Sequence, residues 1–188
     1  DGNGNQSTFS YNYSGGRFDA VDREFRGFNY SIQTNPDDTM VRRWFHQDDY
    51  FKGKDYQINF ESPSATLSRI ESNWDKVNFS QGAFVKLVYK SREIYDGYTV
   101  KLDQSYSYDD SNGNLISTLS SGPGAETLTI AQQYDNYGAW NWRRIQLLVS
   151  GSQSGTVREI NYGYESGTGN MLFRKQWNDR GESPIIRW

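Results

Sequence analysis

The sequence predicts an all-β protein in which antiparallel hairpins repeat along a curved or spiralling sheet. Aromatic residues make up 16% of the 188 residues, and aromatic side chains are enriched in strands. Glycine, serine, asparagine and aspartate are abundant, and these residues favour tight turns. No stretch of a dozen residues shows a clean helical period. Together these observations indicate strands joined by short turns.

Residues 1–60 are predicted to form an N-terminal hairpin segment. Aromatic or apolar residues alternate there with polar ones, as in half-buried strands. The predicted strands are residues 8–13, 27–33, 40–45 and 56–61. The predicted turns between them are Ser14-Gly15-Gly16, Asn35-Pro36-Asp37-Asp38 and Lys52-Gly53-Lys54-Asp55. Because proline fixes φ at the second turn position, the hairpin over residues 26–45 is the clearest local prediction.

Residues 61–102 are predicted to be a connecting β segment. Residues 83–89 and 93–102 are expected to be a pair of strands. Residues 69–76 come nearest to a helical pattern, and they allow a single helical turn. All segments are expected to form one continuous structural unit.

Residues 103–188 contain a tyrosine-rich turn unit that occurs three times. Each copy is a strand ending in Tyr-Asp or Tyr-Glu, then a Gly/Asn turn and a second strand. The residues assigned to the turns are Tyr108, Asp109, Gly113 and Asn114; Tyr134, Asp135 and Gly138; and Tyr164, Glu165, Gly169 and Asn170. The strands around them are predicted at residues 127–133, 143–149, 156–164 and 171–177. Such repeats are typical of architectures that stack supersecondary units.

The turn residues have a physical rationale. Glycine and asparagine supply the positive φ angles that tight hairpin turns require. A carboxylate just before the turn can accept hydrogen bonds from the turn's N–H groups. A tyrosine ring can pack on a neighbouring unit while its hydroxyl reaches a polar partner. These residues therefore predict a structural role and supply no chemistry of their own.

Composition argues against several classes of protein. The net charge is −3, and the basic pairs Arg42-Arg43 and Arg143-Arg144 are too small to form a nucleic-acid-binding patch. No apolar run approaches the ~20 residues that span a bilayer, so no membrane insertion is expected. The chain has no cysteine, which excludes thiol catalysis and cysteine-ligated metal centres. No cofactor is predicted.

His46 is the one histidine of the chain, and it lies close to Asp48 and Asp49. A functional interpretation makes it a general base oriented by a carboxylate, or a metal ligand. No Gly-x-Ser-x-Gly motif accompanies it. A hydrolase centred on His46 is therefore kept as a second alternative, beside a structural role at the end of a strand.

No metal site is predicted. The chain opens at Asp1-Gly2-Asn3-Gly4-Asn5, like a calcium loop, and it is expected to be a mature or excised segment. Gln6 stands where such a loop needs glycine, and Asn12 stands where it needs a bidentate glutamate. Asp109-Asp110 leaves room only for a weak cation site.

Aromatic residues near the middle turn suggest another alternative, a carbohydrate-binding module. Rings exposed on a β-surface can stack on sugars, whereas the same rings can instead fill a core or line a shell. Trp140 and Trp142 are two residues apart, so they are expected on one face of a strand. The candidate residues are Trp140, Trp142, Tyr137 and Trp177.

The turns resemble the defining turn of the Rhs/YD-repeat family. The resemblance rests on Tyr108-Asp109 with Gly113-Asn114-Leu115, on residues 133–138 and on residues 164–170. Glu165 departs from the pattern by replacing an aspartate, and Ala139-Trp140-Asn141-Trp142 departs from the expected alternating strand. Residues 18–28 and 44–54 are similar to stretches in Rhs-type proteins and in the B components of insecticidal toxin complexes. Residues 61–78 match least.

The resemblance implies a large spiralling β-sheet shell, used as a capsule around a toxic C-terminal domain or as an extracellular interaction surface. Neither the self-cleaving segment that ends many such shells nor a toxin domain is recognisable. The resemblance thus predicts a non-enzymatic scaffold, secreted or on the surface of a bacterial or archaeal cell. The expected partners are other copies of the chain, the rest of a larger Rhs-like protein, or glycans. Self-association is expected because strand edges of a shell segment remain unpaired.

Overall fold

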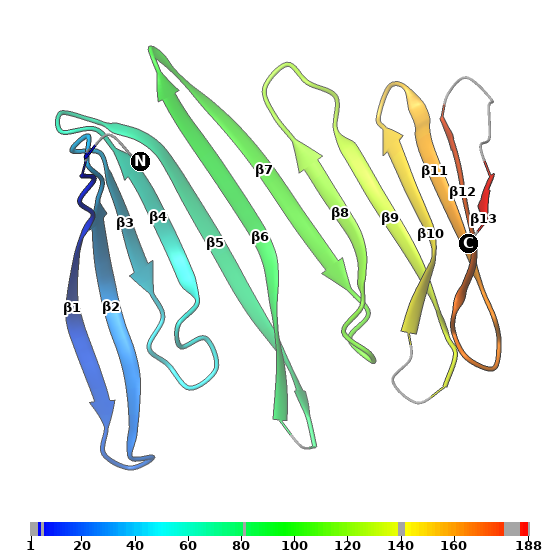
Figure 1. Cartoon of the computed structure of the whole chain (residues 1–188), viewed down its shortest axis with the longest axis horizontal. Coiled ribbons are helices and arrows are strands. Elements are labelled where there is room, and N and C mark those ends of the chain that lie inside the picture. Colours follow the sequence, from blue (N-terminus) through cyan, green and yellow to red (C-terminus); the bar gives the residue numbers. More distant parts are fainter. Residues whose placement is uncertain (1–3, 5, 81, 139–141, 179–184, 188) are drawn as a thin grey trace. The chain divides into compact units, whose positions relative to one another are not determined.

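The computed structural model describes residues 4, 6–80, 82–138, 142–178 and 185–187. These residues form strands and turns, and no helix occurs among them (Figure 1). The all-β prediction is therefore confirmed, as is the antiparallel pairing of successive strands. None of the described residues belongs to a helix that could cross a membrane.

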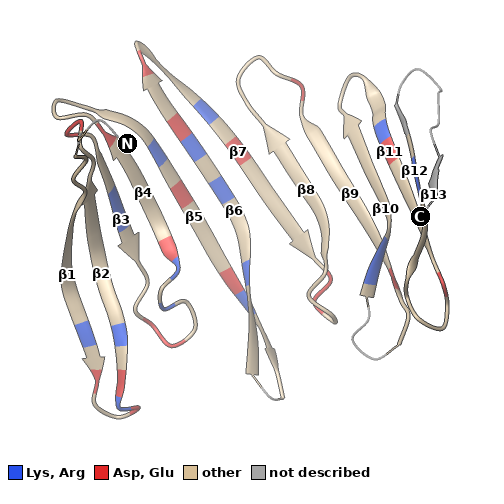
Figure 2. Cartoon of the chain, in the orientation of Figure 1, with Lys and Arg blue, Asp and Glu red and all other residues tan. Residues whose placement is uncertain are grey.

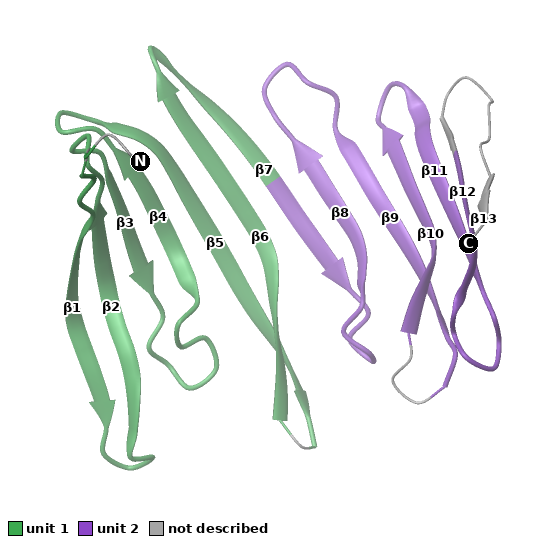
Figure 3. Cartoon of the chain, viewed as in Figure 1, with its two compact units in different colours: residues 1–103 green, residues 104–188 purple. Residues whose placement is uncertain are grey.

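The chain divides into two compact units, residues 1–103 and 104–188 (Figure 3). In each unit the strands are hydrogen-bonded in the order in which they occur in the sequence. The first unit contains β1 (Ser10–Asp19), β2 (Glu24–Thr34), β3 (Met40–Phe45), β4 (Asp55–Glu61), β5 (Thr66–Phe79) and β6 (Gly82–Asp96). The second contains β8 (Leu115–Ser121), β9 (Leu128–Asn136), β10 (Trp142–Gly151), β11 (Gly155–Tyr164), β12 (Met171–Asn178) and β13 (Ile185–Arg187). The unit boundary falls within β7 (Tyr98–Tyr108).

The hairpin predicted over residues 26–45 is confirmed. Tyr30 on β2 lies opposite Trp44 on β3, and their ring centroids are 5.2 Å apart. In the turn between them, the N–H of Asp38 donates to the carbonyl of Asn35 at 3.0 Å. Asp38 has a φ of 61°, a conformation that aspartate tolerates better than most residues. The turn chemistry therefore sets this register, as the sequence predicts.

Three local predictions are wrong. Residues 14–16 are not a turn, because β1 continues through them opposite β2. Residues 69–76 form no helical turn but the middle of the 14-residue strand β5. Residues 82–96 form one strand, β6, so the break predicted after residue 89 is absent, and the chain turns at Gly97 (φ 70°). In each case hydrogen bonds to neighbouring strands outweigh a local preference for polar or small residues.

Charged residues of both signs occur along β5 and β6 (Figure 2). Arg69 lies opposite Glu93, and Asp75 lies opposite Lys86. Opposite charges facing each other across strands stabilise a sheet, whereas like charges would destabilise it. This pairing explains how a strand as polar as β5 is held in the sheet.

The described residues bury few apolar side chains. Ile58 and Ile160 are the buried hydrophobic residues, at 9% and 6% exposure. The buried polar residues are Arg26, Asn59, Ser68, Ser72, Lys86, Ser91 and Thr118. The solvent-accessible surface is 12398 Å², whereas a globular protein of this mass exposes about 9,200 Å². Each unit is a single layer of sheet, without the second layer against which a domain normally buries its core.

Candidate functional site

The first tyrosine turn begins immediately after β7, which ends at Tyr108. The N–H of Asp109 donates to the carbonyl of Asn114 at 2.9 Å, and the N–H of Gly113 donates to the carbonyl of Asp109 at 2.7 Å. The carboxylate of Asp109 accepts from the N–H and hydroxyl of Ser111 and from the side chain of Asn112. The Ser111 hydroxyl and these N–H donors hold the pKa of Asp109 below its ordinary value. The aspartate thus closes the turn, a role that depends on its position and charge.

The third turn has the same backbone frame. The N–H of Glu165 donates to the carbonyl of Asn170 at 2.9 Å, and the N–H of Gly169 donates to the carbonyl of Glu165 at 2.8 Å. The φ of Gly169 is 69°, and that of Gly113 is 78°. The Glu165 carboxylate accepts from the hydroxyl of Thr168. Glutamate therefore replaces aspartate without changing the turn.

The middle copy is built differently. Strand β9 does not end at Tyr134 but continues through Asp135 to Asn136, which pairs with Trp142 on β10. The N–H of Gly138 donates to the side-chain oxygen of Asn136 at 2.9 Å. The pair of backbone bonds that closes the other two turns is not found among the described residues of this copy. The departure seen in the sequence at residues 139–142 thus coincides with a different hairpin end.

In each unit an arginine on one strand bridges both neighbouring strands. Arg42 on β3 donates to the Tyr30 hydroxyl on β2 at 2.8 Å and to the Glu61 carboxylate on β4 at 2.6 Å. The bond to Tyr30 and the charge of Glu61 raise the pKa of Arg42 despite its partial burial. In the second unit, Arg144 on β10 donates to the side-chain oxygen of Gln132 on β9 at 2.8 Å and to the Tyr162 hydroxyl on β11 at 3.0 Å. These bridges hold three strands at a fixed register.

Arg26 is the most buried charged residue among those that the structure describes, with 2% of its side chain exposed. Its guanidinium is paired with Asp19 at 3.2 Å, with Asp22 at 2.5 Å and with Asp49, and its Nε lies 3.9 Å from Glu24. Burial opposes the charge, but Asp49 and the other carboxylates outweigh it and raise the pKa of Arg26. Asp19, Asp22 and Asp49 are close enough to hold a metal ion, yet the guanidinium already bonds to all three.

These contacts join the two non-repeating stretches, residues 18–28 and 44–54. Besides the pair of Arg26 with Asp49, Lys52 donates to Glu24 at 2.6 Å. The side chain of Gln47 donates to the carbonyl of Gly27 at 2.8 Å. The two stretches that resemble toxin-complex proteins therefore form one contact region. Sequence reasoning missed this cluster, although the acidic residues Asp19, Asp22 and Glu24 just before Arg26 are a visible signal for it.

His46 is packed between aromatic rings. Its ring centroid lies 5.5 Å from that of Phe51 and 5.1 Å from that of Tyr56. Its Nδ1 is 3.6 Å from a carboxylate oxygen of Asp48. Burial raises the pKa of Asp48, but hydrogen bonds from the N–H groups of Phe51 and Tyr50 outweigh burial, so the pKa is lowered. This carboxylate is engaged in closing the loop after His46.

Asp49, the second carboxylate predicted near His46, forms an ion pair with Arg26. A pocket of about 330 Å³ is lined by His46, Tyr56, Trp74 and Ser72. Ser72 is 5% exposed, and it makes no hydrogen bond with His46 within the described part of the chain. The structure thus gives the histidine a packing partner on each side and no oriented nucleophile there.

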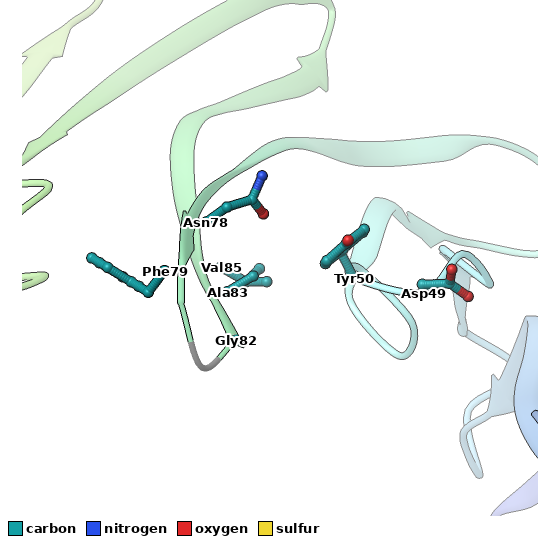
Figure 4. A pocket seen from close by; sticks show the side chains of 7 residues that line it. All are labelled: Asp49, Tyr50, Asn78, Phe79, Gly82, Ala83 and Val85. Atoms are coloured by element: carbon teal, nitrogen blue, oxygen red, sulfur yellow. The ribbon is translucent and has the colours of Figure 1, made fainter.

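Another pocket of the first unit, of about 490 Å³, lies between the loop at Tyr50 and the end of the β5–β6 hairpin (Figure 4). The Nζ of Lys76 lies 2.9 Å from the centroid of the Tyr50 ring. In Figure 4 the Phe79 ring points away from Tyr50, and 47% of Phe79 is exposed. The pocket is an open gap beside a cation–π contact.

The aromatic residues proposed for sugar binding lie in different surroundings. Trp142 begins β10, and the ring of Tyr137 lies 5.6 Å from that of Tyr164. Trp177 is paired through its backbone with Glu159. Trp140 lies outside the described residues, so its shared face with Trp142 stays a prediction. The carbohydrate-binding surface drawn from all four residues also stays a prediction.

The first part of the sequence matches a known family model. Residues 1–59 match the model described as the insecticide toxin TcdB middle/N-terminal region. The match covers both stretches that meet at Arg26. Comparison with curated proteins finds no match.

The fold resembles solved toxin-complex structures over most of the chain. The crystal structure of TcdB2-TccC3 superposes with a TM-score of 0.70 at 10% identity, covering 92% of this chain and 16% of that one. The Tc holotoxin pore of Photorhabdus luminescens superposes with a TM-score of 0.68 at 10% identity, covering 89% of this chain and 15% of that one. The chain thus spans about a sixth of these chains, and at this identity the likeness shows the fold. The similarity to Rhs-type and toxin-complex B proteins that the motifs predict is confirmed, in sequence over residues 1–59 and in fold over nearly the whole chain.

Proposed function

We propose that this chain is a non-enzymatic wall segment of an Rhs-like encapsulating shell, within a larger secreted toxin-type protein. The observation that carries the proposal is the agreement of two independent likenesses. The match of residues 1–59 to the TcdB model and the fold likeness to TcdB2-TccC3 point to the same kind of protein.

The single layer of sheet is consistent with the proposed role as part of a shell wall. Aromatic side chains such as Phe9, Tyr11, Tyr13 and Phe18 are more than half exposed. An exposed apolar surface of this extent is typical of a surface that meets other protein. The rest of a longer polypeptide is the natural partner, because the chain spans only 16% of the TcdB2-TccC3 chain it resembles.

The polar interactions also support a scaffold. Arg26, Arg42 and Arg144 each bond to groups on other strands or loops. Such charge-assisted bonds fix the geometry of the sheet, and the guanidinium of each of these arginines donates to at least two neighbouring protein groups. We therefore propose that these three arginines hold the strands and loops of the wall together.

The test uses the full-length protein that contains this segment, imaged by electron cryomicroscopy and digested with trypsin. We expect a hollow particle with these strands in its wall and an enclosed segment protected from trypsin. Arg26→Met should expose that segment, because it removes the buried ion pair of Arg26 with Asp49, one of the contacts between residues 18–28 and 44–54. Arg23→Met is the matched control, since Arg23 is exposed and has no partner among the described residues. A solid particle, or substrate turnover that vanishes in His46→Ala, would contradict the proposal.

A further inference from the structure

The first tyrosine turn contains the dipeptide Asn112-Gly113, one of two Asn-Gly pairs in the sequence; the other is Asn3-Gly4. An asparagine followed by glycine is prone to lose its side-chain amide spontaneously, because glycine has no Cβ to obstruct the attack of its own backbone nitrogen. The attack requires that this nitrogen be free to reach the side chain. Whether Asn112 reacts therefore depends on how the turn holds that nitrogen and that side chain.

The reacting groups are all held by hydrogen bonds in the folded turn. The N–H of Gly113 donates to the carbonyl of Asp109 at 2.7 Å. The Nδ2 of Asn112 donates to the carboxylate of Asp109 at 2.7 Å, and its Oδ1 accepts from the N–H of Asn114 at 2.9 Å. Asn112 is only half-buried, so water reaches it once these bonds break. The hydrogen bonds, more than burial, therefore protect this amide.

The third turn shows that the frame does not require an amide at this place. Thr168 occupies there the position that Asn112 occupies in the first turn. Its hydroxyl donates to the carboxylate of Glu165 and accepts from the N–H of Asn170 at 3.2 Å, which are the counterparts of the two bonds that Asn112 makes. A hydroxyl cannot be deamidated. Position 112 thus carries a reactive group in a role that an inert group fills in the third turn.

We propose that Asn112 is a self-modification site, which converts to aspartate or isoaspartate when the first tyrosine turn opens. On opening, the backbone nitrogen of Gly113 forms a bond to Cγ of Asn112 and the Cγ–Nδ2 bond breaks. The proton of the Gly113 N–H leaves with Nδ2 as ammonia. Water then opens the cyclic imide. Attack of water at Cγ leaves an aspartate in the ordinary backbone, whereas attack at the α-carbonyl carbon routes the chain through Cβ as isoaspartate.

Either product hinders the turn from closing again. Both replace the Nδ2 donor that Asp109 accepts by a carboxylate, close to the carboxylates of Asp109 and Asp110, and like charges repel. Isoaspartate also lengthens the backbone before Gly113 by one carbon atom, which displaces the N–H that donates to Asp109. An opening of the turn is thereby recorded as a covalent change that refolding does not reverse. The proposal does not depend on whether the sheet forms a shell wall.

The test follows deamidation by peptide mapping with mass spectrometry, in mildly alkaline buffer with and without urea. Asn3-Gly4 reports on the same chemistry in the unfolded chain, so Asn3 and Asn112 should react at similar rates in urea. In buffer Asn112 should react at least about tenfold more slowly than in urea, since the reactive form is reached only by local opening. NMR hydrogen exchange of the Gly113 N–H measures that opening directly. Deamidation of Asn112 should be slowed by at least the same factor as this exchange.

Variants of the two turns supply the controls. Asp109→Ala should speed deamidation of Asn112 in buffer at least about fivefold, because a hydrogen bond to a charged group is lost. Glu165→Ala changes the equivalent carboxylate of the third turn and should leave that rate unchanged. Asn112→Thr copies the third turn and should keep the thermal midpoint of the parent protein, whereas Asn112→Asp should lower it.

Three results would overturn the proposal. The first is equal rates of Asn112 deamidation in buffer and in urea. The second is an Asp109→Ala variant in which the Gly113 N–H exchanges faster while deamidation stays as slow as in the parent protein. The third is an Asn112→Asp variant as stable as Asn112→Thr, because the product would then leave the turn intact.

Discussion

The positive φ angles of Gly113 and Gly169 give the tyrosine turns a measurable energetic signature. Their φ values are 78° and 69°, in the left-handed region where a Cβ costs roughly 1–2 kcal/mol. Replacing glycine by alanine also removes freedom from the unfolded chain, which offsets about 0.4–1 kcal/mol. Gly113→Ala and Gly169→Ala should therefore each lower the free energy of unfolding by about 1 kcal/mol. In a chain of this length that lowers Tm by roughly 2–4 °C.

Two further variants separate backbone strain from other causes. Asparagine tolerates the left-handed region, so Gly113→Asn should keep most of the stability that Gly113→Ala loses. Gly167 lies in the third turn without a positive φ, and a Cβ there would meet nothing within 4 Å. Gly167→Ala should therefore leave the stability unchanged or raise it slightly. Urea unfolding followed by tryptophan fluorescence, together with thermal unfolding, measures all four variants.

The reasoning would be refuted by two results. If Gly113→Asn destabilised the protein as much as Gly113→Ala, the conformation of residue 113 would not be the cause. If Gly167→Ala were as harmful as Gly169→Ala, the turn would be sensitive to any side chain. The double variant of Gly113 and Gly169 should lose about 2 kcal/mol, because separated sites add.

Three other perturbations test the interactions described above. Hydrogen bonds from the Ser154 hydroxyl and from the N–H groups of Ser154 and Gln153 lower the pKa of Glu126. Its contribution to stability is therefore present above its unfolded pKa of about 4.3 and is lost as the pH falls through the folded value. Glu126→Gln should flatten the acid limb of the curve of stability against pH, and an unaltered limb speaks against this. A double-mutant cycle with Arg42→Met and Glu61→Gln should give a coupling of about 1 kcal/mol in urea unfolding, and a value near zero means that the 2.6 Å pair contributes nothing. Strand β1 is an edge strand with nine of its ten residues exposed, so the protein should self-associate in sedimentation velocity. The double variant Tyr11→Lys, Tyr13→Lys should reduce this self-association. A monomer at high concentration would contradict the expectation.

Local chemistry made much of the fold predictable. The turn at residues 35–38 and the strand at residues 40–45 follow from a proline, two aspartates and a short apolar alternation. Strand β5 was not predictable in this way, because Asn73, Asp75 and Lys76 are poor strand formers by themselves. They are held by pairing with β6, since β4 pairs with β5 only between Thr66 and Glu71, and cross-strand partners such as Lys86 are distant in sequence.

The candidate site was less predictable than the fold. Asp109 and Asn114 were assigned to a turn from their spacing, but the pocket that lies beside this turn also needs residues of β9 and β10, whose approach the spacing does not reveal. The Arg26 cluster needs Asp49, which lies 23 residues further along the chain. A periodic pattern can predict neighbours within a hairpin, whereas it cannot predict which loop covers which strand.

The scarcity of buried apolar side chains around Ile58 and Ile160 has a calorimetric consequence. The heat capacity rises on unfolding chiefly because apolar surface becomes hydrated, and an ordinary chain of this length gains about 2–3 kcal/mol/K. Much of that surface is already hydrated in this fold, so the increase should be smaller. The curve of free energy against temperature is then flatter, and the sheet should keep a nearly constant stability across the temperatures at which its host lives.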